Sequence, residues 1–133
     1  WDLHQAMIQD ASLEIFDQLE SGDMVFYDGS HVTKTGSDVN WIFFNVMPRL
    51  KPGVLVHFHD IFFPRDYPQH WVLEMHKSWN EQYMLQAFLM HNDSWKVEIA
   101  NAYLAHQQGP KLKELYQDLQ MAYGGSIWLR KTR

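Results

Sequence analysis

The chain contains no cysteine among its 133 residues. Disulfide bonds and thiolate metal sites are therefore excluded, and any bound metal would need oxygen and imidazole ligands. The absence of cysteine also fits a reducing compartment, so we expect the protein to be cytoplasmic.

Long apolar runs and basic runs are missing as well. No stretch approaches the roughly 18 apolar residues of a membrane span, and residues 1–5 have neither the basic nor the apolar part of a signal peptide. With 11 basic and 16 acidic side chains, the formal charge of −5 does not attract nucleic acid or an anionic membrane. We expect a soluble protein with no nucleic-acid or membrane partner.

Nucleotide-binding signatures are a third absence. The chain has no Gly-x-Gly-x-x-Gly, no Gly-x-Ser-x-Gly and no phosphate-binding loop. Its one pair of adjacent glycines, Gly124 and Gly125, precedes the last predicted strand. The sequence therefore shows no dinucleotide or nucleotide site of its own.

The first half of the chain shows a strand, helix and strand after an opening helix. Apolar residues at helical spacing predict an amphipathic helix over residues 3–19. Residues 24–27 form a short apolar run that predicts a strand buried on both faces. Ser37 or Asp38 can cap a second helix, whose last turn Pro48 should kink, and residues 54–60 predict a second strand. This order is typical of a parallel βαβ unit.

The second half adds two strands and further helices. Trp71, Met75, Trp79 and Tyr83 mark a predicted helix, whose aromatic residues we interpret as packing. Residues 95–99 alternate as an edge strand would, 111–122 predict a helix and 126–130 a last strand. With 46% hydrophobic residues, the chain is predicted to be one α/β domain.

Polar side chains gather where the first two predicted strands end. Asp28 follows one strand, with His31 three residues later, and His59 and Asp60 end the other. The carboxyl ends of parallel strands form the ligand crevice of open α/β sheets. These groups could hold a divalent cation or act as acid and base. Each alone is more simply a turn cap, but burying several without use would cost free energy.

Two neighbouring features refine this prediction. His57 lies on the opposite face of its strand from Asp60, so we interpret it as structural. The loop over residues 61–70 is rich in aromatic side chains, and such loops often cover sites. We therefore predict that Phe62, Phe63 and Tyr67 contact the substrate.

Residues 28–31 (Asp-Gly-Ser-His) and 50–60 (Leu-Lys-Pro-Gly-Val-Leu-Val-His-Phe-His-Asp) resemble the later half of class I S-adenosylmethionine-dependent methyltransferases, particularly methyltransferase family 24. The resemblance continues through residues 79–83, 87–89, 101–103 and 124–129. It implies a Rossmann-like α/β methyltransferase sheet, with strands four to seven present and the last one antiparallel. Residues 1–133 would form one partial domain without the N-terminal cofactor-binding half, so the cofactor-binding residues are unknown.

The resemblance also implies an activity. The parent domain would transfer a methyl group from S-adenosylmethionine to an oxygen of a small or glycan-linked acceptor, while this chain alone would be nearly inactive. Metal-dependent relatives place Mg²⁺ or Mn²⁺ ligands at the positions of Asp28, His59 and Asp60. The histidine departs from their acidic or amide norm, and it permits His31 or His59 to be the catalytic base.

Two alternatives stay open at this point. The same histidines and carboxylates could form the divalent-metal site of a hydroxylase or hydrolase. The chain could instead be a non-catalytic remnant that forms a homodimer through an exposed sheet edge.

Overall fold

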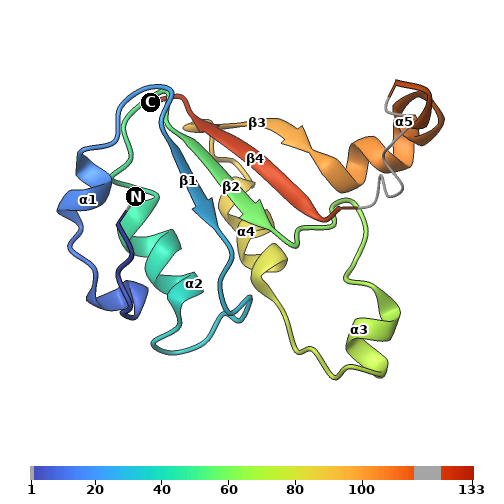
Figure 1. Cartoon of the computed structure of the whole chain (residues 1–133), viewed down its shortest axis with the longest axis horizontal. Helices are drawn as coiled ribbons and strands as arrows, with labels where there is room; N and C mark the ends of the chain where they lie inside the picture. The colour runs from blue at the N-terminus through green and yellow to red at the C-terminus, as the bar shows by residue number, and fades with distance from the viewer. Residues whose placement is uncertain (1, 116–123) are drawn as a thin grey trace.

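A computed structural model describes residues 2–115 and 124–133 of the chain. Its four strands form one sheet in the order β1-β2-β4-β3 (Figure 1). β1 and β2 are parallel, whereas β4 is antiparallel to both of its neighbours. The strands are β1 (Met24–Tyr27), β2 (Leu55–His59), β3 (Trp95–Ala100) and β4 (Ser126–Lys131). All four predicted strands are confirmed, with bounds that agree to within one residue. The antiparallel direction of the last strand and the edge position of β3 are also confirmed.

The predicted helix over residues 3–19 is wrong. The structure has a 3₁₀ turn, η1 (Ile8–Asp10), and a single helical turn, α1 (Glu14–Asp17). Ala11 between them is extended, with a ψ of 141°. The Ser12 hydroxyl accepts a hydrogen bond from the Glu14 N–H at 3.3 Å. Such local bonding competes with a continuous helix.

The second predicted helix is present and continues into a π-helical turn. α2 (Asp38–Trp41) is capped by Ser37, whose hydroxyl accepts from the Asn40 N–H at 3.2 Å. η2 (Ile42–Val46) follows, and its last bond joins the Met47 N–H to the Ile42 carbonyl at 2.9 Å. Pro48 has no N–H to continue an α-helical ladder, which accounts for the irregular end.

The helix predicted around Trp71 and Tyr83 is two helices, α3 (Gln69–Leu73) and α4 (Glu81–Leu89). His76, with a φ of 53°, lies in the left-handed region and interrupts them. α5 (Asn101–Leu115) begins earlier than predicted and is kinked at Gln108. Residues 116–122 of that prediction lie outside the described residues. None of the helices in the described ranges is both long and apolar enough to cross a membrane.

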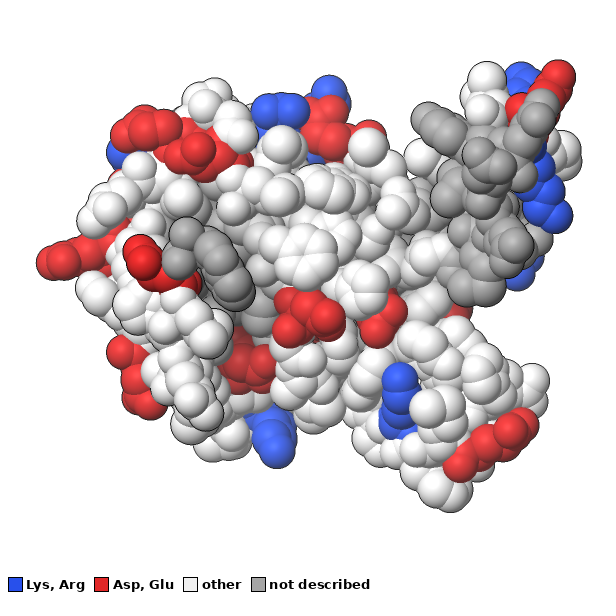
Figure 2. Space-filling model, in the orientation of Figure 1, with Lys and Arg blue, Asp and Glu red and all other residues white. Residues whose placement is uncertain are grey.

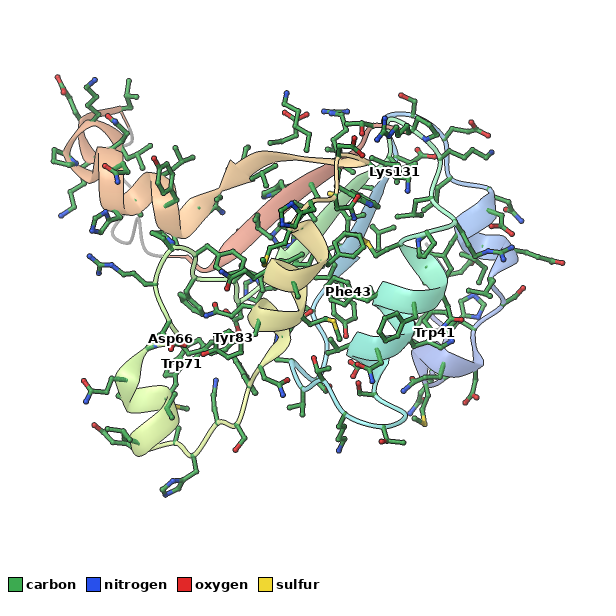
Figure 3. The ribbon with its side chains drawn as sticks, turned by 180° about the vertical axis from the view of Figure 1, so that it is seen from behind. Trp41, Phe43, Asp66, Trp71, Tyr83 and Lys131 are labelled. Atoms are coloured by element: carbon green, nitrogen blue, oxygen red, sulfur yellow. The ribbon has the colours of Figure 1, made fainter. Side chains whose placement is uncertain are left out.

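One face of the sheet carries the core. Phe58 on β2 is fully buried and stacks on Phe43 of η2, with ring centroids 5.2 Å apart. Phe88 of α4 packs edge-on against the same Phe43 at 5.3 Å. Figure 3 shows α2 and α4 on this side of the strands, with Phe43 between helix and sheet. The core thus joins β2 to both helices.

The other face of the sheet is open. Met24 and Phe26 on β1 are 47% and 59% exposed, and Ile99 on β3 is 43% exposed. Phe26 stacks on His57 at 4.4 Å, and His57 packs against Trp128 at 4.6 Å. Figure 1 shows this face in front of α4, and Figure 2 shows largely uncharged side chains over the strands. The prediction that β1 is buried on both faces is therefore wrong, because no described helix covers this one.

Two alanine substitutions compare the faces. Phe58→Ala should lower the free energy of unfolding by about 3–5 kcal/mol, because it empties a closed part of the core. Phe26→Ala should cost less than about 1 kcal/mol, because most of that ring is already in contact with water. Urea unfolding of both variants measures the difference. Equal costs would mean that a further layer covers Phe26 in solution.

Candidate functional site

The turn after β1 is fixed by the carboxylate of Asp38. Its Oδ2 accepts from the Ser30 N–H at 2.7 Å and from the Tyr27 hydroxyl at 2.9 Å, and its Oδ1 accepts from the Ser30 hydroxyl. Burial by itself raises the pKa of Asp38, but these hydrogen bonds lower it overall. A Cβ at Gly29 would lie 2.3 Å from both Asp38 Oδ2 and the Tyr27 hydroxyl, so the turn requires glycine. Asp28 and His31 flank this rigid turn.

His31 is tied to the start of α4. Its carbonyl accepts from the N–H groups of Asn80 and Glu81, at 2.9 and 3.2 Å. The Thr33 N–H donates to Asn80 Oδ1 at 2.5 Å. His31 itself has a φ of 57°, in the left-handed region. The loop after β1 is therefore held against a helix that begins 50 residues later.

The two ring nitrogens of His31 face different carboxylates. Nδ1 lies 2.8 Å from Oε2 of Glu81, whose side chain is 1% exposed. Nε2 lies 3.2 Å from Asp28 Oδ1 and 3.9 Å from Asp60 Oδ2. The buried Glu81 thus orients the ring, and Nε2 points toward the carboxyl ends of β1 and β2.

The charges around His31 set its protonation. Burial lowers the pKa of His31, but the hydrogen bond and charge of Glu81, followed by the charges of Asp60 and Asp28, raise it overall. Burial raises the pKa of Glu81. Because Nδ1 is engaged by Glu81, Nε2 is the nitrogen available to exchange a proton with a ligand.

The predicted residues at the end of β2 are divided between two faces. Asp60, with a φ of 56°, turns toward His31, and its N–H donates to the Gly125 carbonyl at 2.7 Å. His59 Nε2 lies 3.5 Å from Asp60 Oδ1, while the ring neighbours His57 at 6.0 Å. His57 is buried, and burial, then the charge of His59, lowers its pKa. Its packing on the open face agrees with the structural interpretation.

The predicted metal site finds no support. Asp28, His59 and Asp60 do not form one ligand set: the described residues contain no group of three or more His, Asp or Glu side chains placed to hold a metal ion. The described residues therefore give no support for a bound Mg²⁺ or Mn²⁺. The carboxylates of Asp28 and Asp60 face the imidazole of His31 instead.

The predicted substrate contacts line three different cavities. Phe62 lines a cavity beside α5, Phe63 one beside α4, and Tyr67 one between α3 and α4. Tyr67 comes closest to the candidate site, because its ring packs edge-on against Trp79 at 6.1 Å and Trp79 contacts His31 at 4.1 Å. The three side chains thus line separate cavities, although the rings of Phe62 and Tyr67 pack edge-on at 5.9 Å.

A further cavity of about 520 Å³ lies beside the Asp28 turn. Asp28, Ser30, Lys34 and Phe26 are among its lining residues. Asp28 therefore lies between His31 and this cavity at the end of β1.

Two residues of the site were missed from the sequence. Glu81 was treated as part of a helix, and Trp79 as packing. No local spacing could have paired Glu81 with His31 across 50 residues. The only signal was a buried position for an acidic residue, which becomes visible once the fold is known.

A comparison with protein families finds a match that covers part of the candidate site. Residues 1–61 match the family model described as a methyltransferase domain. The match includes Asp28, His31, His59 and Asp60, and confirms the resemblance to a methyltransferase family over this segment. Searches of curated proteins and of solved structures found no match. The first 61 residues are thus similar to a methyltransferase domain.

The Glu81–His31 contact can be tested by titration. Glu81→Gln should lower the pKa of His31, because the buried charge that favours the imidazolium is removed while burial stays. Nuclear magnetic resonance of the His31 ring against pH measures the shift, and Glu98→Gln, which removes a partly buried carboxylate paired with Arg130, is the control. Because the folded pKa is raised, the stability from this contact should be complete below pH about 6.5 and lost as the pH rises through the folded pKa. An unchanged His31 pKa in Glu81→Gln would contradict this.

Proposed function

We propose that this chain forms the acceptor side of an S-adenosylmethionine-dependent O-methyltransferase, with His31 as the general base. The observation that carries the proposal is the position of His31. One ring nitrogen is bound by the buried carboxylate of Glu81, and the other faces Asp28 and Asp60 at the strand ends. The match of residues 1–61 to a methyltransferase domain supports the reaction class.

The chemistry assigned to His31 is proton removal. An acceptor hydroxyl at Nε2 donates a hydrogen bond, and the imidazole takes its proton as the oxygen attacks. The resulting positive charge is stabilised by Glu81, and by Asp28 and Asp60 on the other side of the ring. S-adenosylmethionine supplies the electrophilic methyl group. The two strand-end carboxylates also orient the hydroxyl, so much of the rate comes from positioning.

The described residues do not by themselves fit the cofactor. No glycine-rich loop within residues 2–115 and 124–133 runs from a strand into a helix, and the turn at Gly29 is filled by Asp38 and Tyr27. We therefore place the cofactor-binding strands beside β1. The order β1-β2-β4-β3 supports this, since strands four, five, seven and six of the implied sheet would give that order with one antiparallel strand. Parallel strands are normally covered by helices on both faces, so the open face leaves room for a second layer.

A homodimer through the same edge competes with this arrangement. β1 is the end strand of the sheet, and its free backbone groups can pair with another chain. Calorimetric titration of S-adenosylhomocysteine into purified protein that includes the cofactor-binding strands, with its oligomeric state fixed by ultracentrifugation, separates the two. Micromolar binding that is insensitive to Mg²⁺ and Mn²⁺ supports the methyltransferase. A folded dimer that binds no S-adenosylhomocysteine would contradict it.

The role of His31 predicts both a rate loss and a pH profile. His31→Gln should lower kcat by about 10²–10⁴-fold, because the base is lost. Since the base must be unprotonated, the rate of methyl transfer should fall as the pH drops through the raised pKa of His31. Glu81→Gln should move that midpoint to lower pH. Formation of S-adenosylhomocysteine against pH measures both effects.

The control is His91→Asn, which alters an exposed histidine with a φ of 57° to a residue that tolerates this backbone. A wild-type rate in His31→Gln, or a pH midpoint that is unchanged in Glu81→Gln, would rule out His31 as the base.

A further inference from the structure

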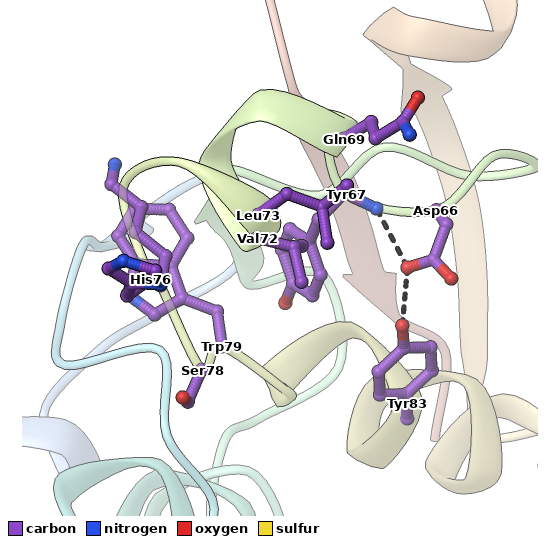
Figure 4. Close-up of a pocket in the computed structure, with 10 residues that line it drawn as sticks. Asp66, Tyr67, Gln69, Val72, Leu73, His76, Ser78, Trp79 and Tyr83 are labelled. Atoms are coloured by element: carbon purple, nitrogen blue, oxygen red, sulfur yellow. Dashed lines mark hydrogen bonds between the residues drawn. The ribbon is translucent and has the colours of Figure 1, made fainter.

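A pocket of about 670 Å³ lies between α3 and the start of α4. It is separated from His31 by the ring of Trp79, which lines the pocket and contacts the imidazole at 4.1 Å. Figure 4 shows Asp66 and Tyr83 on one side of the pocket and His76, Ser78 and Trp79 on the other. Its lining residues are Asp66, Tyr67, Gln69, Val72, Leu73, His76, Lys77, Ser78, Trp79 and Tyr83.

Asp66 is held in a fixed position at the edge of this pocket. Its Oδ1 accepts from the Tyr67 N–H at 2.8 Å and from the Tyr83 hydroxyl. The hydrogen bond to Asp66 is also the main cause of the raised pKa of Tyr83. Both bonds use the same oxygen, so Oδ2 is left for a ligand donor. Tyr83 is 46% exposed and offers part of its ring to the same space.

Trp79 is braced from the other direction. Lys77 Nζ lies 3.9 Å from the ring centroids of both Trp71 and Trp79. Trp71 and Trp79 also pack edge-on at 5.2 Å. Such cation–π contacts fix the segment between α3 and α4. Trp79 thus forms the wall between the pocket and His31, and a ligand in the pocket lies next to the candidate active site.

We propose that this pocket binds a sugar residue of the methyl acceptor. The inference rests on the proposed function, because it assigns the acceptor of the same site to the saccharides. The observation that supports the inference is the number of polar side chains around the pocket. A site for a small apolar or phenolic ligand is mostly hydrophobic and has few polar groups. Here five hydrogen-bonding side chains surround the aromatic walls: Asp66, Gln69, His76, Lys77 and Ser78.

The side chains of this lining suit the chemistry of a pyranose. The C–H groups of a sugar ring pack against aromatic side chains such as Tyr83, while its hydroxyls at the rim reach donors and acceptors on several sides. Asp66 accepts bonds only, and Gln69 and Ser78 can both donate and accept. The carboxylate of Asp66 disfavours an anionic ligand such as phosphate. A neutral, hydroxyl-rich ligand satisfies all of these groups.

Saturation-transfer magnetic resonance and calorimetry on the purified protein test the assignment without the reaction. The probes are N-acetyl-D-glucosamine and the methyl glycosides of glucose, mannose and rhamnose, with catechol and inorganic phosphate for comparison. At least one sugar should bind saturably, and more tightly than catechol or phosphate. Asp66→Asn should weaken that sugar at least tenfold, and Tyr83→Phe, which frees Asp66, should weaken it less.

The matched control is Glu74→Gln, which makes the same carboxylate-to-amide change on an exposed residue outside the pocket lining. It should leave sugar binding unchanged. The assignment is overturned if no sugar saturates, if catechol binds more tightly, or if Asp66→Asn binds like the wild type. Sugar binding without any methyl transfer would support the sugar assignment and contradict the proposed function. His31-dependent transfer to a non-sugar acceptor would support the proposed function and contradict the sugar assignment.

Discussion

The hydrogen bond between His31 and Glu81 is the contact on which the candidate site depends. It joins a loop after β1 to the first turn of α4, and its carboxylate is buried. Removing one partner would leave the other as an uncompensated polar group inside the protein, which is far costlier than loss of a surface bond. The loop is further tied by the N–H groups of Asn80 and Glu81. The position of His31 Nε2 is thus set by α4 as well as by the sheet.

Much of the fold could be predicted from the sequence, because β1 and β2 are short apolar runs followed by Asp and β3 alternates between apolar and polar residues. Ser37 also capped its helix as expected. The helix predictions were wrong where single residues act locally. Ser12 interrupts the first predicted helix, and His76 separates α3 from α4. Periodicity alone cannot detect such breaks. Asp28, Asp60 and His31 come together because strand ends meet at one edge. Glu81 could not be predicted, since its partner is set by tertiary packing.

The division of the sheet into a covered and an open face links the fold to the proposed reaction. Tyr27 and Phe58 close the core on one side, while Phe26 and His57 face outward on the other. His31, Asp28 and Asp60 lie at the strand ends, where both faces meet. In the proposed enzyme, these residues form the acceptor side, and the cofactor-binding strands lie beside β1.

The contacts of Trp79 with Lys77 and His31 have a spectroscopic consequence. The indole of Trp79 has an ammonium group 3.9 Å from its ring centroid and an imidazole whose ring centroid is 4.1 Å away. Imidazolium quenches indole emission more strongly than neutral imidazole does, so the emission of Trp79 reports the charge of the neighbouring ring. A change in Trp79 emission with pH therefore follows the protonation of His31.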